Sequence, residues 1–206
     1  MEFQTSQEQL WSDQDFGNDY QQRNNEISLF KCKKYMYKQV FKHIDSISSV
    51  IEFGPNIGLN LKAITELNTN INDIRAVELN KQACEILKTN NYDVIEKSIT
   101  DYNDFDKKYD FVLSAGLLIH LQPSLLERAY KALYESSKRY ICIAEYYDPN
   151  PVSIPYRGHN DKLFKRDFAG EMMDKYPDLK LVDYKFTYKR DNKFPLDDIT
   201  WFLLEK

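Results

Sequence analysis

The sequence predicts a single α/β domain built on a doubly wound, mostly parallel sheet. Strand-like and helical segments alternate from about residue 49 onward, a glycine-containing turn follows the first strand, and the chain closes with two successive strand-like segments. The 206 residues are enough for one domain with a full core. We therefore expect a seven-stranded Rossmann-like sheet that ends in a C-terminal antiparallel hairpin.

The parallel strands are predicted from short apolar segments bounded by turn residues. They are expected at 49–53, 74–78, 93–96, 109–114 and 140–145, and helical stretches separate most of them. Such alternation produces parallel neighbours because each helix carries the chain back along the sheet.

After the last of these strands the pattern changes. Residues 145–159 read as a long irregular segment, and a helix is expected at 167–175 with Asp167 as its N-cap. Two long strands follow at 179–190 and 199–205, joined by a short proline-containing loop. A dehydrogenase-type Rossmann domain would continue with a parallel strand instead of this hairpin.

Residues 1–48 precede the first strand. They are expected to be an N-terminal helical extension of the domain, whose main part spans 49–206. A helix is predicted from about 28 to 43. The aromatic and polar stretch 11–24 is interpreted as a lid over a bound ligand, the alternative being that it merely covers the first helix.

Composition and charge exclude several kinds of protein. Apolar residues make up 42% and charged residues 29% of the chain, as in a globular protein, and no apolar run approaches the ~20 residues of a membrane span. The net charge of −4 and the dispersed basic residues argue against a nucleic-acid partner. Cys32, Cys84 and Cys142 lie far apart and lack metal-ligand spacing, so we expect no metal. Their odd number argues against a disulfide framework, so we expect reduced cysteines and a cytoplasmic protein.

The turn after the first strand is the main candidate ligand site. Gly54 and Gly58 let the backbone approach a ligand closely, and the following helix offers free N–H groups. Asn56 stands where the dinucleotide fingerprint has its middle glycine. Glu52, two residues before the first glycine, suits a cationic methionine moiety better than a pyrophosphate.

Two later strand ends complete a nucleoside-binding pattern. Glu78 ends the second strand, where a carboxylate can accept hydrogen bonds from both ribose hydroxyls. Ser98 and Ile99 follow the third strand, where an adenine amino group could be recognised. Each feature alone has an ordinary explanation, a simple turn or a solvated strand end, and their order along the chain favours the ligand.

Four segments resemble the cofactor motifs of class I S-adenosylmethionine-dependent methyltransferases: 52–58, Glu78, 98–101 and 109–116. The resemblance implies S-adenosylmethionine as the cofactor and S-adenosylhomocysteine as its product. The expected cofactor-binding residues are Tyr20, Asn24, Glu52, Gly54, Pro55, Asn56, Gly58, Glu78, Leu79, Ser98, Ile99, Ser114, Ala115 and Gly116.

More specifically, the chain resembles the pseudaminic acid biosynthesis-associated methylases. The similarity lies in 8–11, 16–24, 145–149, 155–159, 164–171 and 197–202, which together extend over nearly the whole length. It implies a methyltransferase of surface polysaccharide or capsule biosynthesis that acts on a small anionic metabolite. O-methylation of a nucleotide-activated or nonulosonate sugar, or of a capsular phosphoramidate precursor, is expected.

Acceptor-binding groups should converge on the carboxyl ends of the later strands. His120 is the leading candidate for a general base, the alternative being a buried histidine that shapes its loop, and His159 is the second candidate. Arg157 could hold a carboxylate or phosphate. The expected acceptor-binding residues are Arg23, Tyr146, Tyr147, Tyr156 and Arg157, which could instead pack the loop.

Three other functions stay open from the sequence. An N-methyltransferase acting on an amino sugar has the same cofactor pattern. A non-catalytic methyltransferase-like binding subunit would have no need of Glu52, Gly54, Gly58 and Glu78. A NAD-dependent oxidoreductase is disfavoured by Glu52 and by the terminal hairpin.

Overall fold

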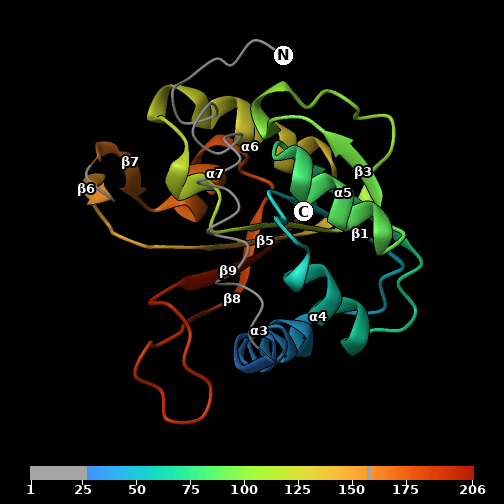
Figure 1. Cartoon of the computed structure of the whole chain (residues 1–206). Coiled ribbons are helices and arrows are strands. Elements are labelled where there is room, and N and C mark those ends of the chain that lie inside the picture. The colour runs from blue at the N-terminus through green and yellow to red at the C-terminus, as the bar shows by residue number, and fades with distance from the viewer. Residues whose placement is uncertain (1–26, 157–158) are drawn as a thin grey trace.

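A computed structural model describes residues 27–156 and 159–206 (Figure 1). Its centre is a seven-stranded sheet of order β3-β2-β1-β4-β5-β9-β8. The strands are β1 (Ser49–Phe53), β2 (Asp73–Glu78), β3 (Asp93–Glu96), β4 (Tyr109–Ala115), β5 (Ser137–Glu145), β8 (Lys180–Phe186) and β9 (Thr200–Glu205). The strands β1 to β5 are parallel, whereas β9 runs antiparallel to both β5 and β8. The predicted fold class and terminal hairpin are confirmed.

Helices cover both faces of the sheet, with α3 and α4 below it and α6 and α7 above it in Figure 1. Their bounds are α3 (Ile27–Val40), α4 (Leu59–Leu67), α5 (Lys81–Thr89), α6 (Leu126–Glu135) and α7 (Phe168–Lys175). The side chain of Asp167 accepts the Gly170 N–H at 2.8 Å, so the predicted N-cap of α7 is confirmed. No helix in the described ranges has the length and apolar composition needed to cross a membrane.

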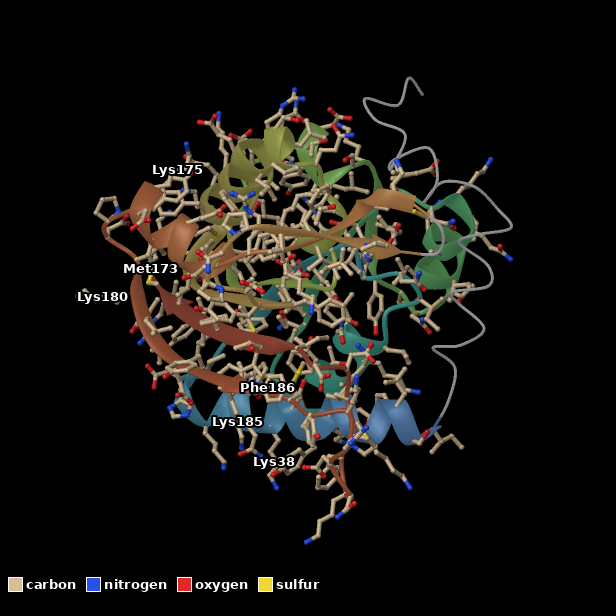
Figure 2. The ribbon with its side chains drawn as sticks, turned by 90° about the vertical axis from the view of Figure 1, so that its left-hand side faces the viewer. Lys38, Met173, Lys175, Lys180, Lys185 and Phe186 are labelled. Carbon is tan, nitrogen blue, oxygen red and sulfur yellow. The ribbon has the colours of Figure 1, made fainter. Side chains whose placement is uncertain are left out.

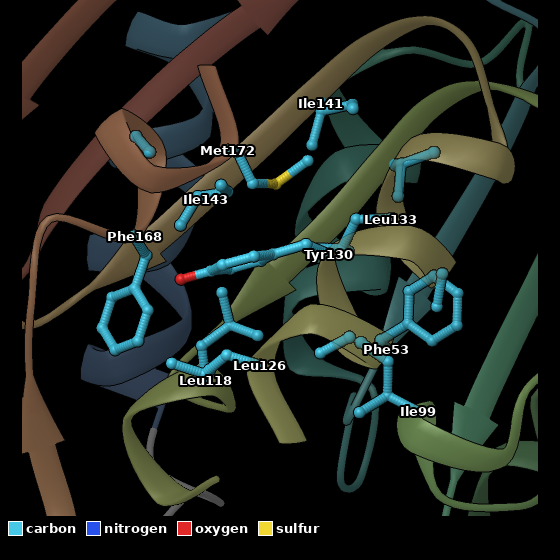
Figure 3. Close-up of a cluster of buried hydrophobic side chains, with 14 of the residues drawn as sticks. Phe53, Ile99, Leu118, Leu126, Tyr130, Leu133, Ile141, Ile143, Phe168 and Met172 are labelled. Carbon is cyan, nitrogen blue, oxygen red and sulfur yellow. The ribbon is translucent and has the colours of Figure 1, made fainter. Parts of the chain in front are cut away.

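Two hydrophobic clusters fix the helices to the sheet. Tyr37 of α3 and Leu61 of α4 belong to the cluster on one face, together with Trp201 of β9. Figure 3 shows the opposite cluster, in which the Tyr130 ring of α6 lies beside Met172 of α7. Because both faces are covered, β1 is buried along its whole length, including the charged residue Glu52.

Two expectations about the second half of the chain are wrong. The segment 145–159, expected to be irregular, contains β6 (Val152–Tyr156) and leads into β7 (His159–Lys165), and the two form an antiparallel pair separate from the main sheet. Pro155 obscures this pair in the sequence, yet it is tolerated because a two-stranded ribbon consists of edge strands.

The loop between β8 and β9 is also longer than expected, because β8 ends at Phe186. The connection from 187 to 199 folds on itself, and the Asp191 carboxylate accepts the N–H groups of Lys193 and Phe194. The ring of Phe194 stacks on Tyr35 of α3 with 3.8 Å between centroids, so the loop packs against that helix.

Candidate active site

A cavity lies at the carboxyl ends of the parallel strands, where ligands bind in open α/β sheets. Its empty volume is about 1040 Å³, including the part open to solvent. The predicted residues that line it are Gly54, Pro55, Asn56, Glu78, Leu79, Ser98, Ile99, Ala115, Gly116 and His120. Most of the predicted cofactor residues within the described ranges are thus brought together at one site.

The turn after β1 requires glycine for its backbone conformation. Gly54 and Gly58 have φ values of 69° and 83°, in the left-handed region that disfavours other residues. A Cβ at Gly58 would lie 2.8 Å from a methyl carbon of Leu87. Gly58 does not line the cavity, so its contribution is to let the turn pack closely against α5.

Glu78 joins the end of β2 to the glycine turn. One carboxylate oxygen accepts the Asn56 N–H at 2.8 Å, and the other accepts the N–H groups of Leu79 and Asn80, each at 2.8 Å. Burial raises the pKa of this carboxyl above its ordinary value. A carboxylate has about four acceptor positions, so the backbone bonds leave room for one ribose hydroxyl, and a second would share a position.

Glu52 reaches the cavity only through another residue. Its Oε1 accepts a 2.6 Å hydrogen bond from the Asn60 amide, whose Oδ1 accepts one from Lys33 Nζ at 2.8 Å. Asn60 and Lys33 line the cavity, whereas Glu52 does not. The Asn60 side chain therefore lies between Glu52 and Lys33, and it is Asn60 that reaches the cavity wall.

Glu145, at the end of β5, holds the turn that follows β4. Its Oε1 accepts hydrogen bonds from the Ser114 hydroxyl and from the N–H groups of Leu117 and Leu118, all at 3.0 Å. The Ile119 N–H points to Oε2 at 3.5 Å. Ser114 was expected to bind the cofactor, yet it is fully buried and does not line the cavity, because its side chain points toward β5.

His120 lies in the cavity wall at the end of the short 3₁₀ helix η3 (Leu118–His120). Its Nδ1 is 2.9 Å from the carbonyl oxygen of Lys162 in β7. Since a carbonyl only accepts, neutral His120 carries its proton on Nδ1 and its basic lone pair on Nε2. Burial lowers the pKa of the ring to about 4, so His120 is neutral at physiological pH.

Of the expected acceptor residues, only Tyr146 and Tyr147 have described side chains, and neither lines this cavity. Tyr146 packs against the hydrophobic core with Lys165 Nζ 5.4 Å from its ring, and Tyr147 lies 5.7 Å from the Phe202 ring, both outside the cavity lining. Tyr20, Arg23, Asn24 and Arg157 lie outside the described residues, as do the side chains of Tyr156 and His159.

The cavity also contains side chains that the sequence patterns did not single out. They are Lys33, Ile57, Leu59, Asn60, Val77, Asn80, Lys97, Leu117 and Leu121. Asn80 and Lys97 are adjacent to the predicted residues Leu79 and Ser98, so their positions at strand ends could have predicted that they line the cavity. No local pattern indicated Lys33, because its contact with Asn60 bridges 27 sequence positions between two helices.

The strand order and a cavity at the β1, β2 and β4 ends define the class I S-adenosylmethionine-dependent methyltransferase fold. Solved structures agree. A methyltransferase of this kind from Clostridium acetobutylicum superposes with a TM-score of 0.64 at 9% identity, covering 92% of this chain and 98% of that one. A counterpart from Archaeoglobus fulgidus gives 0.66 at 13% identity, with 94% and 100% covered.

The plantazolicin methyltransferase BpumL, solved in complex with S-adenosylhomocysteine, is also similar. Its TM-score is 0.66 at 15% identity, and the match covers 98% of this chain and 94% of BpumL. At identities of 9–15%, these structural matches establish the fold alone. No family model and no curated protein matches the sequence, so the finer resemblance to pseudaminic acid biosynthesis-associated methylases stays a prediction.

Proposed function

We propose that this protein is an S-adenosylmethionine-dependent methyltransferase. The observation that carries the proposal is the buried Glu78 carboxylate, which lies beside the left-handed glycine turn in the wall of the cavity. A carboxylate at the end of the second strand is suited to ribose hydroxyls. The three free cysteines are buried, which suits a reducing compartment such as the cytoplasm.

The residues of the cavity fit the cofactor along its length. Glu78 would hold the ribose, Ser98 and Ile99 the adenine, and Asn60 and Lys33 the charged amino-acid end. Gly116 has φ 70°, and a Cβ added to it would meet no atom within 4 Å, so its backbone leaves space for a ligand. When bound, S-adenosylmethionine supplies a methyl group on a positively charged sulfur for in-line displacement.

His120 is the proposed general base for a hydroxyl acceptor. When a hydroxyl acceptor takes the methyl group that the bound cofactor would supply, its proton would pass to His120 Nε2. The bond from Nδ1–H to the Lys162 carbonyl holds the ring in the tautomer that this step needs. The low pKa keeps the ring unprotonated before the reaction.

For the acceptor we propose a small anionic metabolite of surface polysaccharide or capsule biosynthesis. The resemblance of the sequence motifs supports this assignment. O-methylation is favoured by the neutral histidine. N-methylation of an amino sugar is the second candidate, and because a neutral amine needs no base, it would make His120 dispensable.

Binding measurements test the cofactor assignment directly. S-adenosylhomocysteine should stabilise the protein against heat, whereas NAD should not, since ligand at 100 times its dissociation constant adds about 2.7 kcal/mol. Glu78→Gln should weaken S-adenosylhomocysteine binding about tenfold or more by calorimetry. Glu96→Gln, at the neighbouring strand end and outside the cavity lining, is the matched control. Stabilisation by NAD alone would refute the proposal.

Catalysis requires a separate test, because a non-catalytic subunit could also bind the cofactor. Candidate hydroxyl and amino acceptors, drawn from nucleotide-activated sugars, nonulosonates and phosphoramidates, are incubated with the protein and S-adenosylmethionine. Release of S-adenosylhomocysteine together with a mass gain of one methylene unit on the acceptor supports the proposal. Cofactor binding without turnover on any of them would favour the binding subunit.

A further inference from the structure

The outer edge of the sheet carries an exposed strand with large aromatic side chains. β8 is the last strand in the sheet order, and no strand within the described ranges pairs with its outer side. Tyr184 and Phe186 are 59% and 52% exposed. Figure 2 views this edge, with Lys185 and Phe186 on β8 above Lys38 of α3. An edge strand with exposed aromatic residues is a common site of strand pairing.

The hydrogen-bonding direction of β8 is known from its connection to β9. Thr187 donates its N–H to the Ile199 carbonyl at 2.8 Å, so alternate residues back along the strand, Lys185 and Asp183, also direct their backbone groups toward β9. The backbone groups of Tyr184 and Phe186 consequently point outward. A register shift between Leu181 and Asp183 confines the regular open edge to the later half of the strand.

The charges on this edge are self-complementary in one antiparallel register. If two copies of β8 pair about an axis at Tyr184, Asp183 of each copy lies opposite Lys185 of the other. An axis at Asp183 or at Lys185 would place like charges opposite each other. The register with its axis at Tyr184 meets both conditions. The backbone groups at the axis point outward, and an Asp183–Lys185 pair lies on each side of it.

We propose that β8 pairs antiparallel with β8 of a second copy about a two-fold axis at Tyr184, which makes one continuous sheet across a homodimer. The Tyr184 ring stacks on the Phe202 ring with 5.8 Å between their centroids, and Tyr184 lies on the same side of the sheet as Phe186. The exposed aromatic face would therefore continue across the axis. β8 contributes no residue to the cavity, so this interface is independent of the proposed catalysis.

Among the residues that the structure describes, His43 competes for the Asp183 carboxylate within the same chain. His43 Nε2 lies 2.9 Å from that carboxylate, yet the Asp183 side chain keeps 37% of its surface exposed. A contact with Lys185 of the second copy is compatible with that exposure. His43→Ala therefore serves as a control for effects of Asp183 substitutions that arise within one chain.

Sedimentation equilibrium tests the proposal through charge reversal. The wild-type protein should sediment at twice the 24.5 kDa of one chain. Asp183→Lys and Lys185→Asp each place like charges across the axis and should raise the dimer dissociation constant about tenfold or more. An equimolar mixture of the two variants should form a dimer again, because each Lys then faces an Asp.

Controls separate this interface from general charge effects. Lys38→Asp reverses an exposed charge on α3, off the strand, and should leave the dimer intact, as should His43→Ala. Circular dichroism establishes that each variant is folded. A wild-type monomer at every concentration, or variants that remain monomeric when mixed, would overturn the proposal.

Discussion

The Nδ1 atom of His120 lies 2.9 Å from the carbonyl oxygen of Lys162, which ties the cavity wall to the β6–β7 ribbon. This contact determines which ring nitrogen carries the proton. We predict that ¹⁵N NMR will find neutral His120 as the Nδ1–H tautomer, titrating at a pKa of about 4. The chain has 3 histidines, so the assignment is direct. A ring protonated on Nε2 alone would contradict the prediction.

Replacements at His120 separate a catalytic base from a structural histidine. In His120→Asn the side-chain amide can still donate to the Lys162 carbonyl, but it has no equivalent of Nε2. If Nε2 is the base, methyl transfer to a hydroxyl should fall by a factor of about 10² to 10⁴ while the melting temperature changes little. Retained activity with His120→Asn would show that only the contact with Lys162 matters.

Glu145 should be among the most sensitive positions for stability. Glu145→Ala leaves the donors of Ser114, Leu117 and Leu118 without their acceptor, and we expect a loss of about 3 kcal/mol or more in the free energy of unfolding. Urea denaturation measures this loss. Glu205→Ala, which removes an acid from the exposed pair with Arg139, should cost less than about 1 kcal/mol.

The buried carboxyls predict a pH dependence of stability. Burial raises the pKa values of Glu52 and Glu145 to about 7, above the ordinary value of 4.5. Between these values the folded protein binds more protons than the unfolded chain, so the contribution of these groups to stability falls as pH rises through that window. The lowered pKa of His120 acts in the opposite direction between about 4 and 6.5.

A pair of glutamine variants isolates this effect. The double variant Glu52→Gln/Glu145→Gln should lose less unfolding free energy than the wild-type protein as the pH rises from 4.5 to 7. Urea denaturation below, within and above the window measures the slope. Parallel curves for variant and wild type would mean that these carboxyls are ionised in the folded state throughout the window.

Alanine at two glycines should have different effects. Gly116→Ala incurs the left-handed backbone cost of about 1 kcal/mol without a clash, because nothing lies within 4 Å of the new Cβ. Gly58→Ala incurs the same cost and also meets Leu87 at 2.8 Å, so it should lose more unfolding free energy. Equal losses in urea denaturation would mean that Leu87 adjusts freely.

The sequence by itself determined the sheet and the glycine turn. Strands β1 and β3 begin and end at the predicted residues, because alternation of apolar segments and turn residues is a local property of the chain. The position of Glu78 at the cavity followed as well, since parallel strands place their carboxyl ends at one edge. The β6–β7 ribbon was missed because its short strands pair only with each other.

Only the tertiary structure decided how the side chains of the site meet. The packing of α3 against α4 brings Lys33 to Asn60 and separates Glu52 from the cavity. The contact of β7 with His120 bridges 42 positions and assigns the proton of the ring. Local patterns predict where strands end, whereas contacts between distant side chains depend on how whole elements pack, which no local pattern encodes.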